Sequence, residues 1–342
     1  MSTPGWPREL VAARLHVVTG KGGTGKTTVA AALALALATG GRRTLLVEVE
    51  GRQGIGRAFD TAPLPYVERK IAVAPGGGEV RALAVDAEAA LLEYFEMFYH
   101  LGVAGRTLRR MGAVEFATTL APGLRDVLLT GKVKECVTRC GKDGRHVYDA
   151  VVLDAPPTGR VVKFLDVTRA MADLAKAGPI HTQSEGVVRL VHSAATAVHL
   201  VTVLEDLPVT ETLDTVTELD AADLRVGAVI VNRRRPRRLP ERAGVATRVT
   251  TAKLRTGLAA AGVALADDVL DGLVVEANEH GERMQVEATA LTKLTDGPVE
   301  PLPRLDLPEI ADGMDLGELY ELAELLVEQG VQVRPVSRSA PR

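Results

Sequence analysis

A short run of glycine, lysine and threonine near the N-terminus has the composition needed to hold phosphate. Residues 20–28, with the sequence GKGGTGKTT, match the pattern G-x-x-x-x-G-K-[ST] directly after one apolar segment and directly before another. In such a loop, backbone N–H groups surround the phosphates, the lysine (here Lys26) contacts the outer phosphates, and the hydroxyl (here Thr27) ligates Mg²⁺. The pattern therefore predicts a site for ATP and Mg²⁺, built from Gly20, Lys21, Gly22, Gly23, Thr24, Gly25, Lys26, Thr27 and Thr28.

The spacing of three glycines in the same loop also matches G-x-G-x-x-G, the pattern of dinucleotide-binding folds. In that alternative, Glu48 or Glu50 would hold a ribose at the end of the next strand. It gives no role to Lys26 and Thr27. It also does not explain Asp154, a carboxylate at the end of a separate apolar segment, where it suits a position near Mg²⁺. We therefore favour the triphosphate site.

Five apolar segments have the length of strands, and most are separated by segments long enough for a helix. They are apolar on both faces, as is typical of a parallel sheet covered by helices on both sides. Residues 27–38 are apolar all round, which predicts a helix inside the protein. We predict a doubly wound, mostly parallel α/β fold with strands Leu15–Thr19, Thr44–Glu50, Val147–Asp154, Ala197–Leu204 and Val226–Asn232.

A single domain over residues 11–330 accounts for these segments. Residues 86–140 have a mostly helical pattern and predict an inserted helical subdomain. A second helical stretch, residues 161–197, is interrupted at Gly178-Pro179, and together the two stretches would create a surface or groove over one edge of the sheet. The polar, proline-containing ends, residues 1–10 and 331–342, predict flexible tails.

Bulk properties favour a cytoplasmic protein without a global affinity for polyanions. Lys and Arg number 41 against 44 Asp and Glu, for a net charge of -3. Only two cysteines occur, and the N-terminus has no basic start followed by an apolar signal core. The longest apolar run, Val29–Ala38, is shorter than the roughly 20 residues that span a bilayer.

Two features together resemble the ArsA-type ATPases, which include the arsenical-pump ATPase and the ATPase that delivers tail-anchored membrane proteins. One is Lys21 at the second position of the loop, and the other is the segment DAPPTGR at residues 154–160. The resemblance covers residues 14 to about 328. The extra lysine is also shared, more remotely, with the MinD and ParA ATPases and with the nitrogenase iron protein.

This resemblance implies a role for several residues. Lys21 would reach the nucleotide of a partner subunit, where a cation stabilises the charge of phosphoryl transfer. Asp154 would lie near Mg²⁺, and the turn Thr158-Gly159 would sense the terminal phosphate and act as a switch. Asn232 would lie beside the adenine. Because the chain has one phosphate loop, the implied assembly is a homodimer or a heterodimer with a paralogous ATPase.

The chain also departs from the family. Where relatives have Asp-Pro-Ala-His, with the aspartate orienting the attacking water, residues 50–53 are Glu-Gly-Arg-Gln, so Glu50 takes that role with a longer side chain. Cys136 and Cys140 are too few for the arsenite site, and no later C-x-x-C can form the zinc clasp of the tail-anchored-protein ATPases. Six methionines are also few for the client groove of those ATPases.

The client is not apparent from the sequence. We expect an ATPase whose nucleotide state is coupled to an unknown client or partner. One alternative is a targeting or adaptor protein that acts at a membrane, with hydrolysis as a timer. A ParA-like DNA-partitioning ATPase is disfavoured by the acidic balance, and no nucleic-acid partner is expected. The basic run at residues 233–238 is interpreted as a solvated loop.

Overall fold

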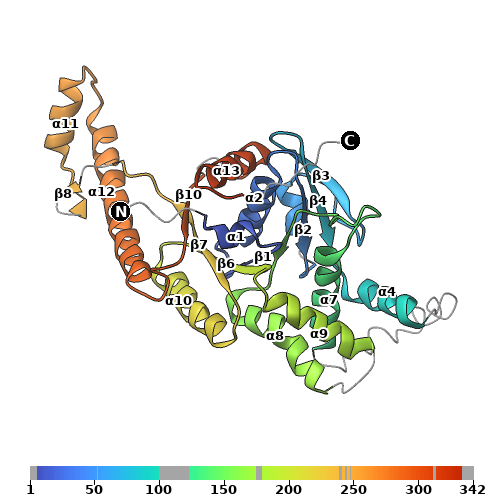
Figure 1. The fold of residues 1–342 in the computed structure, drawn as a ribbon. Coiled ribbons are helices and arrows are strands. Elements are labelled where there is room, and N and C mark those ends of the chain that lie inside the picture. Colours follow the sequence, from blue (N-terminus) through green and yellow to red (C-terminus); the bar gives the residue numbers. More distant parts are fainter. Residues whose placement is uncertain are drawn as a thin grey trace.

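The computed structural model describes residues 6–51, 53–99, 123–174, 179–238, 241–242, 245–246, 248–310 and 313–332. An eight-stranded sheet passes through the centre of the molecule (Figure 1), in the order β10-β7-β6-β1-β5-β2-β4-β3. Neighbouring strands are parallel throughout, except β3 and β4. The strands are β1 (Leu15–Gly20), β2 (Arg43–Glu48), β3 (Arg69–Ala74), β4 (Gly78–Ala84), β5 (Ala150–Asp154), β6 (Thr196–Thr202), β7 (Val226–Arg234) and β10 (Arg304–Pro308).

The central strands are apolar on both faces because helices cover both sides of the sheet. On β1, the side chain of Val18 joins one apolar cluster and that of Val17 joins the cluster on the opposite face. Leu46 and Leu45 of β2 divide in the same way. The predicted α/β fold with a mostly parallel sheet is thereby confirmed.

One helical layer is organised around α2 (Lys26–Ala38), which packs against α13 (Leu316–Glu328). From Val29 to Ala38, every residue of α2 is at most 1% exposed, which confirms that this helix is internal. Short helices α1 (Arg8–Val11) and α3 (Gly54–Ala58) contribute to the same apolar cluster.

The other layer contains α4 (Ala87–Tyr99), α7 (Leu124–Thr138), α8 (Thr158–Leu174), α9 (Pro179–Val191) and α10 (Asp206–Ala221), which lie together below the sheet in Figure 1. Helices α4 and α7 are the described parts of the predicted insertion, whereas residues 100–122 lie outside the described residues. Helix α8 ends at Leu174 and α9 begins at Pro179, the second residue of the predicted interruption, whereas residues 175–178 lie outside the described residues.

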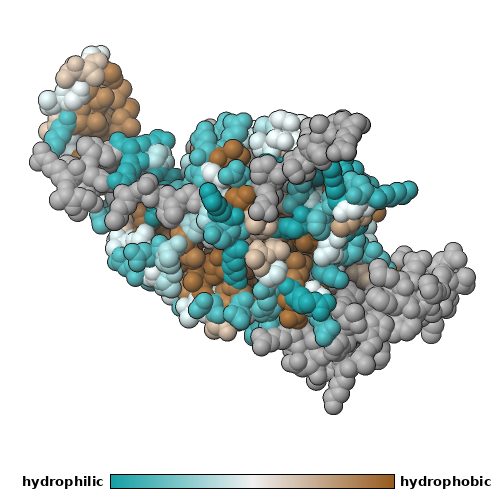
Figure 2. Space-filling view, viewed as in Figure 1, coloured by the Kyte–Doolittle hydropathy of each residue, from teal (hydrophilic) through white to brown (hydrophobic). Residues whose placement is uncertain are grey.

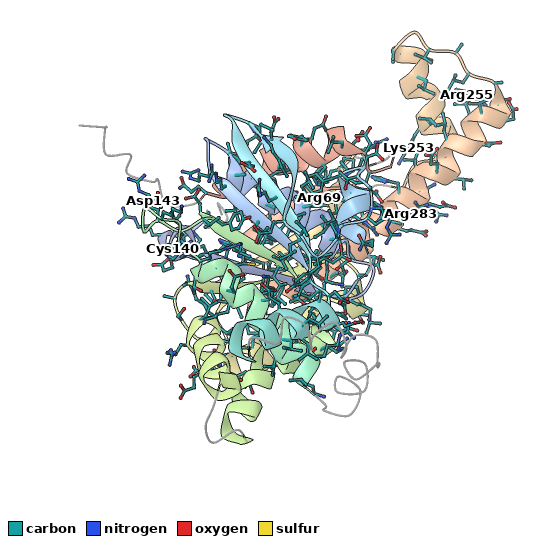
Figure 3. All side chains as sticks on the ribbon, turned by 90° about the vertical axis from the view of Figure 1, so that its right-hand side faces the viewer. Arg69, Cys140, Asp143, Lys253, Arg255 and Arg283 are labelled. Atoms are coloured by element: carbon teal, nitrogen blue, oxygen red, sulfur yellow. The ribbon has the colours of Figure 1, made fainter. Side chains whose placement is uncertain are left out.

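An arm of two helices was not anticipated from the sequence. Helices α11 (Thr251–Ala260) and α12 (Asp267–Thr295) are inserted between β7 and β10 and project from the body (Figures 1 and 3). The short pair β8 (Glu241–Arg242) and β9 (Val245–Ala246) lies against α12. No residue of α11 is buried, whereas Ala290 and Leu294, near the end of α12, join the cluster that contains α10. Among the described residues, the arm therefore joins the buried apolar cluster through the end of α12.

Residues 6–10 do not form the loose tail that we expected. Trp6 and Leu10 are buried, and the indole of Trp6 stacks on the imidazoles of His16 and His199. Its Nε1 donates a hydrogen bond to the carbonyl oxygen of Gln332 at 3.1 Å. A large apolar ring can cover the end of β1 in this way, so the two ends of the described chain meet.

Within the described residues, no helix is both long and apolar enough to serve as a membrane span.

Candidate functional site

The phosphate loop connects the carboxyl end of β1 to the first residue of α2. Gly25, immediately before the helix, has a left-handed backbone with φ of 89°. A Cβ atom at this position would lie 2.4 Å from Nδ2 of Asn232. The loop therefore needs glycine for two independent reasons, backbone conformation and close approach of a side chain.

Asn232, near the carboxyl end of β7, stabilises this loop through a hydrogen bond. It is 5% exposed, and its Nδ2 donates a hydrogen bond to the carbonyl oxygen of Thr24 at 2.9 Å. The sequence placed Asn232 near the adenine, and the structure places it against the phosphate loop.

Thr27 and Asp154 meet directly beneath the loop. The Oγ1 of Thr27 donates a hydrogen bond to Oδ2 of Asp154 at 2.6 Å. The pKa of Asp154 is raised to about 6, chiefly by burial; the Thr27 hydrogen bond and Lys26 oppose the rise, and the neighbouring carboxylates Glu48 and Glu50 add to it. A hydroxyl and a buried carboxylate are oxygen donors of the kind that Mg²⁺ takes together with phosphate oxygens and water, so this pair fits Mg²⁺.

Glu48 is a site residue whose role the sequence analysis missed. It is 2% exposed and is the register partner of Asp154 across β2 and β5. Its carboxylate accepts hydrogen bonds from the backbone N–H groups of Gly54 at 3.4 Å and Ile55 at 3.2 Å. It thus fixes the start of α3 beside Thr27 and is not available to hold a ribose, as the dinucleotide alternative would require. Its place on the same strand end as Glu50 was the available signal.

Glu50 follows β2 and faces the start of α8. Its Oε1 lies 3.5 Å from a guanidinium nitrogen of Arg160. Both residues line a cavity of about 120 Å³, together with Arg125 and Asp126. The cavity has room for several water molecules beside the Glu50 carboxylate. Arg52, which the sequence offered as a further contact, lies outside the described residues.

The segment after β5 is tied to the strand that leads into the phosphate loop. Thr19 Oγ1 donates a hydrogen bond to the carbonyl oxygen of Pro156 at 2.7 Å, and the N–H of Ala155 donates to the carbonyl oxygen of Val18 at 3.0 Å. Helix α8 begins two residues later, at Thr158. A displacement at the loop therefore has a hydrogen-bonded route to the predicted switch turn.

Lys21 points to a residue that the sequence analysis did not consider. Its ammonium group forms an ion pair with Glu211 of α10. The second oxygen of the same carboxylate accepts a hydrogen bond from Thr158 Oγ1 at 3.3 Å. Glu211 is remote in sequence from both partners, and nothing in its local pattern distinguishes it from the other acidic residues of α10. The remaining loop residue, Thr28, lies half-buried in α2.

The cysteines lie away from this site. Cys136 is buried and Cys140 is exposed, on a loop that Figure 3 shows far from the arm. Burial raises the pKa of the Cys136 thiol to about 12, which makes it a poor metal ligand. His146 Nδ1 lies 3.8 Å from the Cys140 sulfur. In the part of the chain that the structure describes, no cluster of three metal-binding side chains was found.

Two arginines of the basic run are engaged in ion pairs. Arg234 pairs with Asp306 of β10, and Arg235 pairs with Glu287 of α12 at 2.7 Å. Arg235 also lies 3.3 Å from Glu309. This part of the run therefore attaches the base of the arm to the sheet.

Comparison with known proteins agrees with this geometry. Residues 13–192, which contain the phosphate loop, Glu50 and Asp154, match the family model described as anion-transporting ATPase. The chain belongs to this family. It is accordingly an ATP hydrolase with a P-loop fold.

Individual relatives differ in how much of the chain they match. The chain is 59% identical over 334 residues to "ATPase BagA" of Mycobacterium tuberculosis, covering 97% of each chain. It is 26% identical to "ATPase get3" of Schizosaccharomyces japonicus, over 50% of this chain and 51% of that one. It is also 27% identical to a predicted arsenical pump-driving ATPase of Aquifex aeolicus, over 47% of this chain and 51% of that one.

Proposed function

We propose that this ATPase uses Mg²⁺ and works as a nucleotide-switched dimer, formed by two copies of the chain or by this chain and a paralogous ATPase. ATP binding would bring the subunits together, and hydrolysis would separate them. The proposed role is to couple this cycle to a client or partner protein.

The observation that supports the proposal most strongly is the contact between Thr27 and Asp154. A hydroxyl at the start of α2 and a buried carboxylate at the end of β5 come within 2.6 Å of one another, directly below a glycine-rich loop. These are the positions from which an Mg²⁺ ion bound to the β- and γ-phosphates would be held. A dinucleotide would use neither group.

Each remaining residue has a proposed part in hydrolysis. The backbone N–H groups of the loop and Lys26 would hold the phosphates, and Asn232 would support the loop beside the adenine. Glu50 would orient the attacking water from the cavity that it lines. Mg²⁺, when bound, would neutralise charge on the phosphate oxygens. Lys21 would add a positive charge to the partner subunit's transferring phosphate.

A second function, nucleotide-gated binding of a client, is favoured by the arm. Large apolar side chains are exposed along it and at its tip, where Figure 2 shows a hydrophobic area on the projecting helices: Val263, Leu265, Val269, Leu273 and Val275. Exposed apolar groups of this kind often mark a surface for a partner. The family resemblance suggests a membrane protein as one such client, and stimulation of hydrolysis by a client would favour this function.

The test is phosphate release from Mg-ATP, measured as a function of protein concentration. For an ATP-dependent homodimer, specific activity rises with concentration, and Lys21→Ala reduces it at least a hundredfold at every concentration. Lys142→Ala, in the exposed loop between Cys140 and Asp143, removes the same charge on the side where β5 begins, opposite the end that carries Asp154, and leaves the activity unchanged. Activity that neither depends on concentration nor changes in Lys21→Ala would refute the proposed dimer mechanism.

A homodimer and a paralogous heterodimer can be separated in the same assay. If the protein binds ATP but releases phosphate only after a paralogous ATPase is added, the second assembly is correct. Binding of a fluorescent ATP analogue in both cases checks that the phosphate loop itself is intact.

A further inference from the structure

The amine of Lys21 is held inside its own subunit. It forms an ion pair with Glu211, and the two side chains are 28% and 35% exposed. A lysine in this contact cannot simultaneously reach the nucleotide of a partner subunit. The contact therefore restrains Lys21, the residue that we propose acts on the partner subunit's nucleotide.

Glu211 also contacts the switch. While one carboxylate oxygen pairs with Lys21, the other accepts the hydroxyl of Thr158 at 3.3 Å. Thr158 is 4% exposed and begins α8, directly after the segment that is hydrogen-bonded to β1. One side chain thus bridges the phosphate loop and the predicted phosphate-sensing turn.

The same turn contacts the other proposed catalytic group. Arg160, two residues after Thr158, lies 3.5 Å from Glu50. Within three residues, the start of α8 therefore touches both the carboxylate that holds Lys21 and the carboxylate assigned to the attacking water. A movement of this turn would alter both contacts together.

We propose that Glu211 is a positioning residue that holds Lys21 within its own subunit and releases it when Thr158 turns towards the terminal phosphate of ATP. This inference rests on the proposed role of Lys21 across the dimer. It adds a restraint on that role, because Lys21 becomes available to the partner only in a subunit whose own switch has moved.

The strength of the contact suits such a restraint. Ion pairs with this degree of exposure contribute little, so their loss changes an equilibrium by about two- to fivefold. A contact of this strength biases the position of Lys21, yet the charge of a triphosphate can overcome it.

The first test measures the holding contact without relying on hydrolysis. The rate of Lys21 acetylation by a soluble acetylating reagent is followed by mass spectrometry in the wild type and in Glu211→Gln, which keeps the shape and removes the charge. We expect Lys21 to react about two- to fivefold faster in the variant. Equal rates in the two proteins would overturn the inference.

Asp206→Asn provides a matched control. It removes one negative charge from the same helix, α10, where Asp206 pairs with Lys293 of α12 at 2.6 Å. Lys21 acetylation in this variant should equal that of the wild type. If it rises as much as in Glu211→Gln, the effect comes from the general charge of the helix and the assignment to Glu211 is wrong.

The second test uses hydrolysis. Glu211→Gln should lower the protein concentration that gives half-maximal specific activity by about two- to fivefold, and it should have no effect when Lys21→Ala is already present. Lower activity at all concentrations, or an unchanged effect in the Lys21→Ala background, would overturn the holding role.

The two tests separate this inference from the proposed function. If acetylation changes as expected while Lys21→Ala retains full activity, Glu211 does hold Lys21, and the role of Lys21 across the dimer fails. If Lys21→Ala is inactive but Lys21 acetylation is the same in the wild type and Glu211→Gln, the dimer mechanism stands without this restraint.

Discussion

The internal helix α2 and the arm helix α12 show two different ways in which this chain keeps a helix folded. In α2, eleven of 13 residues are buried, and the apolar cluster of one sheet face surrounds them. In α12, five of 29 residues are buried, and several of its largest apolar side chains face outwards. Packing specifies the first helix, whereas local propensity and side-chain pairs must maintain most of the second.

This difference separates rigid and adaptable parts of the molecule. The phosphate loop depends on angstrom-scale placement, and it leads directly into α2, in which eleven of 13 residues are buried. In the part of the chain that the structure describes, the arm joins the buried cluster through Ala290 and Leu294 near the end of α12, so changes in its outer part should scarcely affect the nucleotide site. Matched substitutions in the two regions test this contrast.

Removing an apolar side chain should have its largest effect in α2. Leu33 is 0% exposed, and Leu33→Ala should lower the free energy of unfolding by about 2–5 kcal/mol through the cavity that it leaves. Val275 of α12 is 58% exposed, and Val275→Ala should change that energy by less than about 0.5 kcal/mol. Denaturant unfolding of both variants measures this. Similar losses would mean that the arm packs against something within the same chain.

A glycine-to-alanine change should impair ATP binding in the phosphate loop, whereas in the arm it should stabilise the helix. Gly25→Ala places a Cβ atom 2.4 Å from Asn232 Nδ2 in a left-handed backbone and should weaken ATP binding at least a hundredfold. Gly272 of α12 has open space around it, so Gly272→Ala should raise helix stability by about 0.5–1 kcal/mol. ATP titration and thermal unfolding measure the two effects. Retention of normal ATP affinity by Gly25→Ala would contradict the described loop geometry.

A third contrast concerns how the stability of the body and of the arm depends on pH. Burial lowers the pKa of His16 to about 4 and also lowers the pKa of His199, with which it shares a 3.0 Å hydrogen bond. In the unfolded chain these histidines bind a proton as the pH falls through about 6.5, whereas in the folded chain they remain neutral there. The difference contributes to the free energy of unfolding above pH 6.5, and this contribution is lost as the pH falls towards 4. For His16 alone, the loss at pH 5 is about 2 kcal/mol.

Urea unfolding at pH 7 and pH 5 measures this loss. His16→Asn, whose side-chain oxygen can still accept from His199, should reduce the loss between these two pH values. The helical signal of the arm should not follow the same pH dependence, because neither histidine contacts it. An unchanged pH dependence in His16→Asn would show that other groups cause the acid sensitivity.

The sequence predicted the elements whose burial can be seen in the apolar pattern of their own residues. Strands with apolar residues on both faces and the uniformly apolar α2 could be recognised from a few neighbouring residues. The hairpin of β3 and β4 was missed, although Gly76-Gly77 between two alternating segments is a turn signal. The arm was missed because its surface is mixed and its helices have few buried residues to impose a clear period.

In the site, too, the predictable residues are those that a local sequence pattern identifies. The phosphate loop and Asp154 stand next to strands that the sequence reveals. The role of Glu211 depends on a contact across 190 sequence positions, and the burial of Glu48 depends on how α3 folds over it. Such roles arise from tertiary packing, which a local pattern does not encode.

The position of α13 has a consequence for how this protein is made. Helix α2 leaves the ribosome well before Leu319, Leu322 and Leu326, which belong to its apolar cluster and follow it by roughly 280 positions in the chain. At about 5–20 residues per second, α2 waits on the order of 15–60 s for that cover. During this interval, its apolar surface is available to chaperones or to other nascent chains. The efficiency of folding should therefore depend on how quickly α13 follows α2 during synthesis.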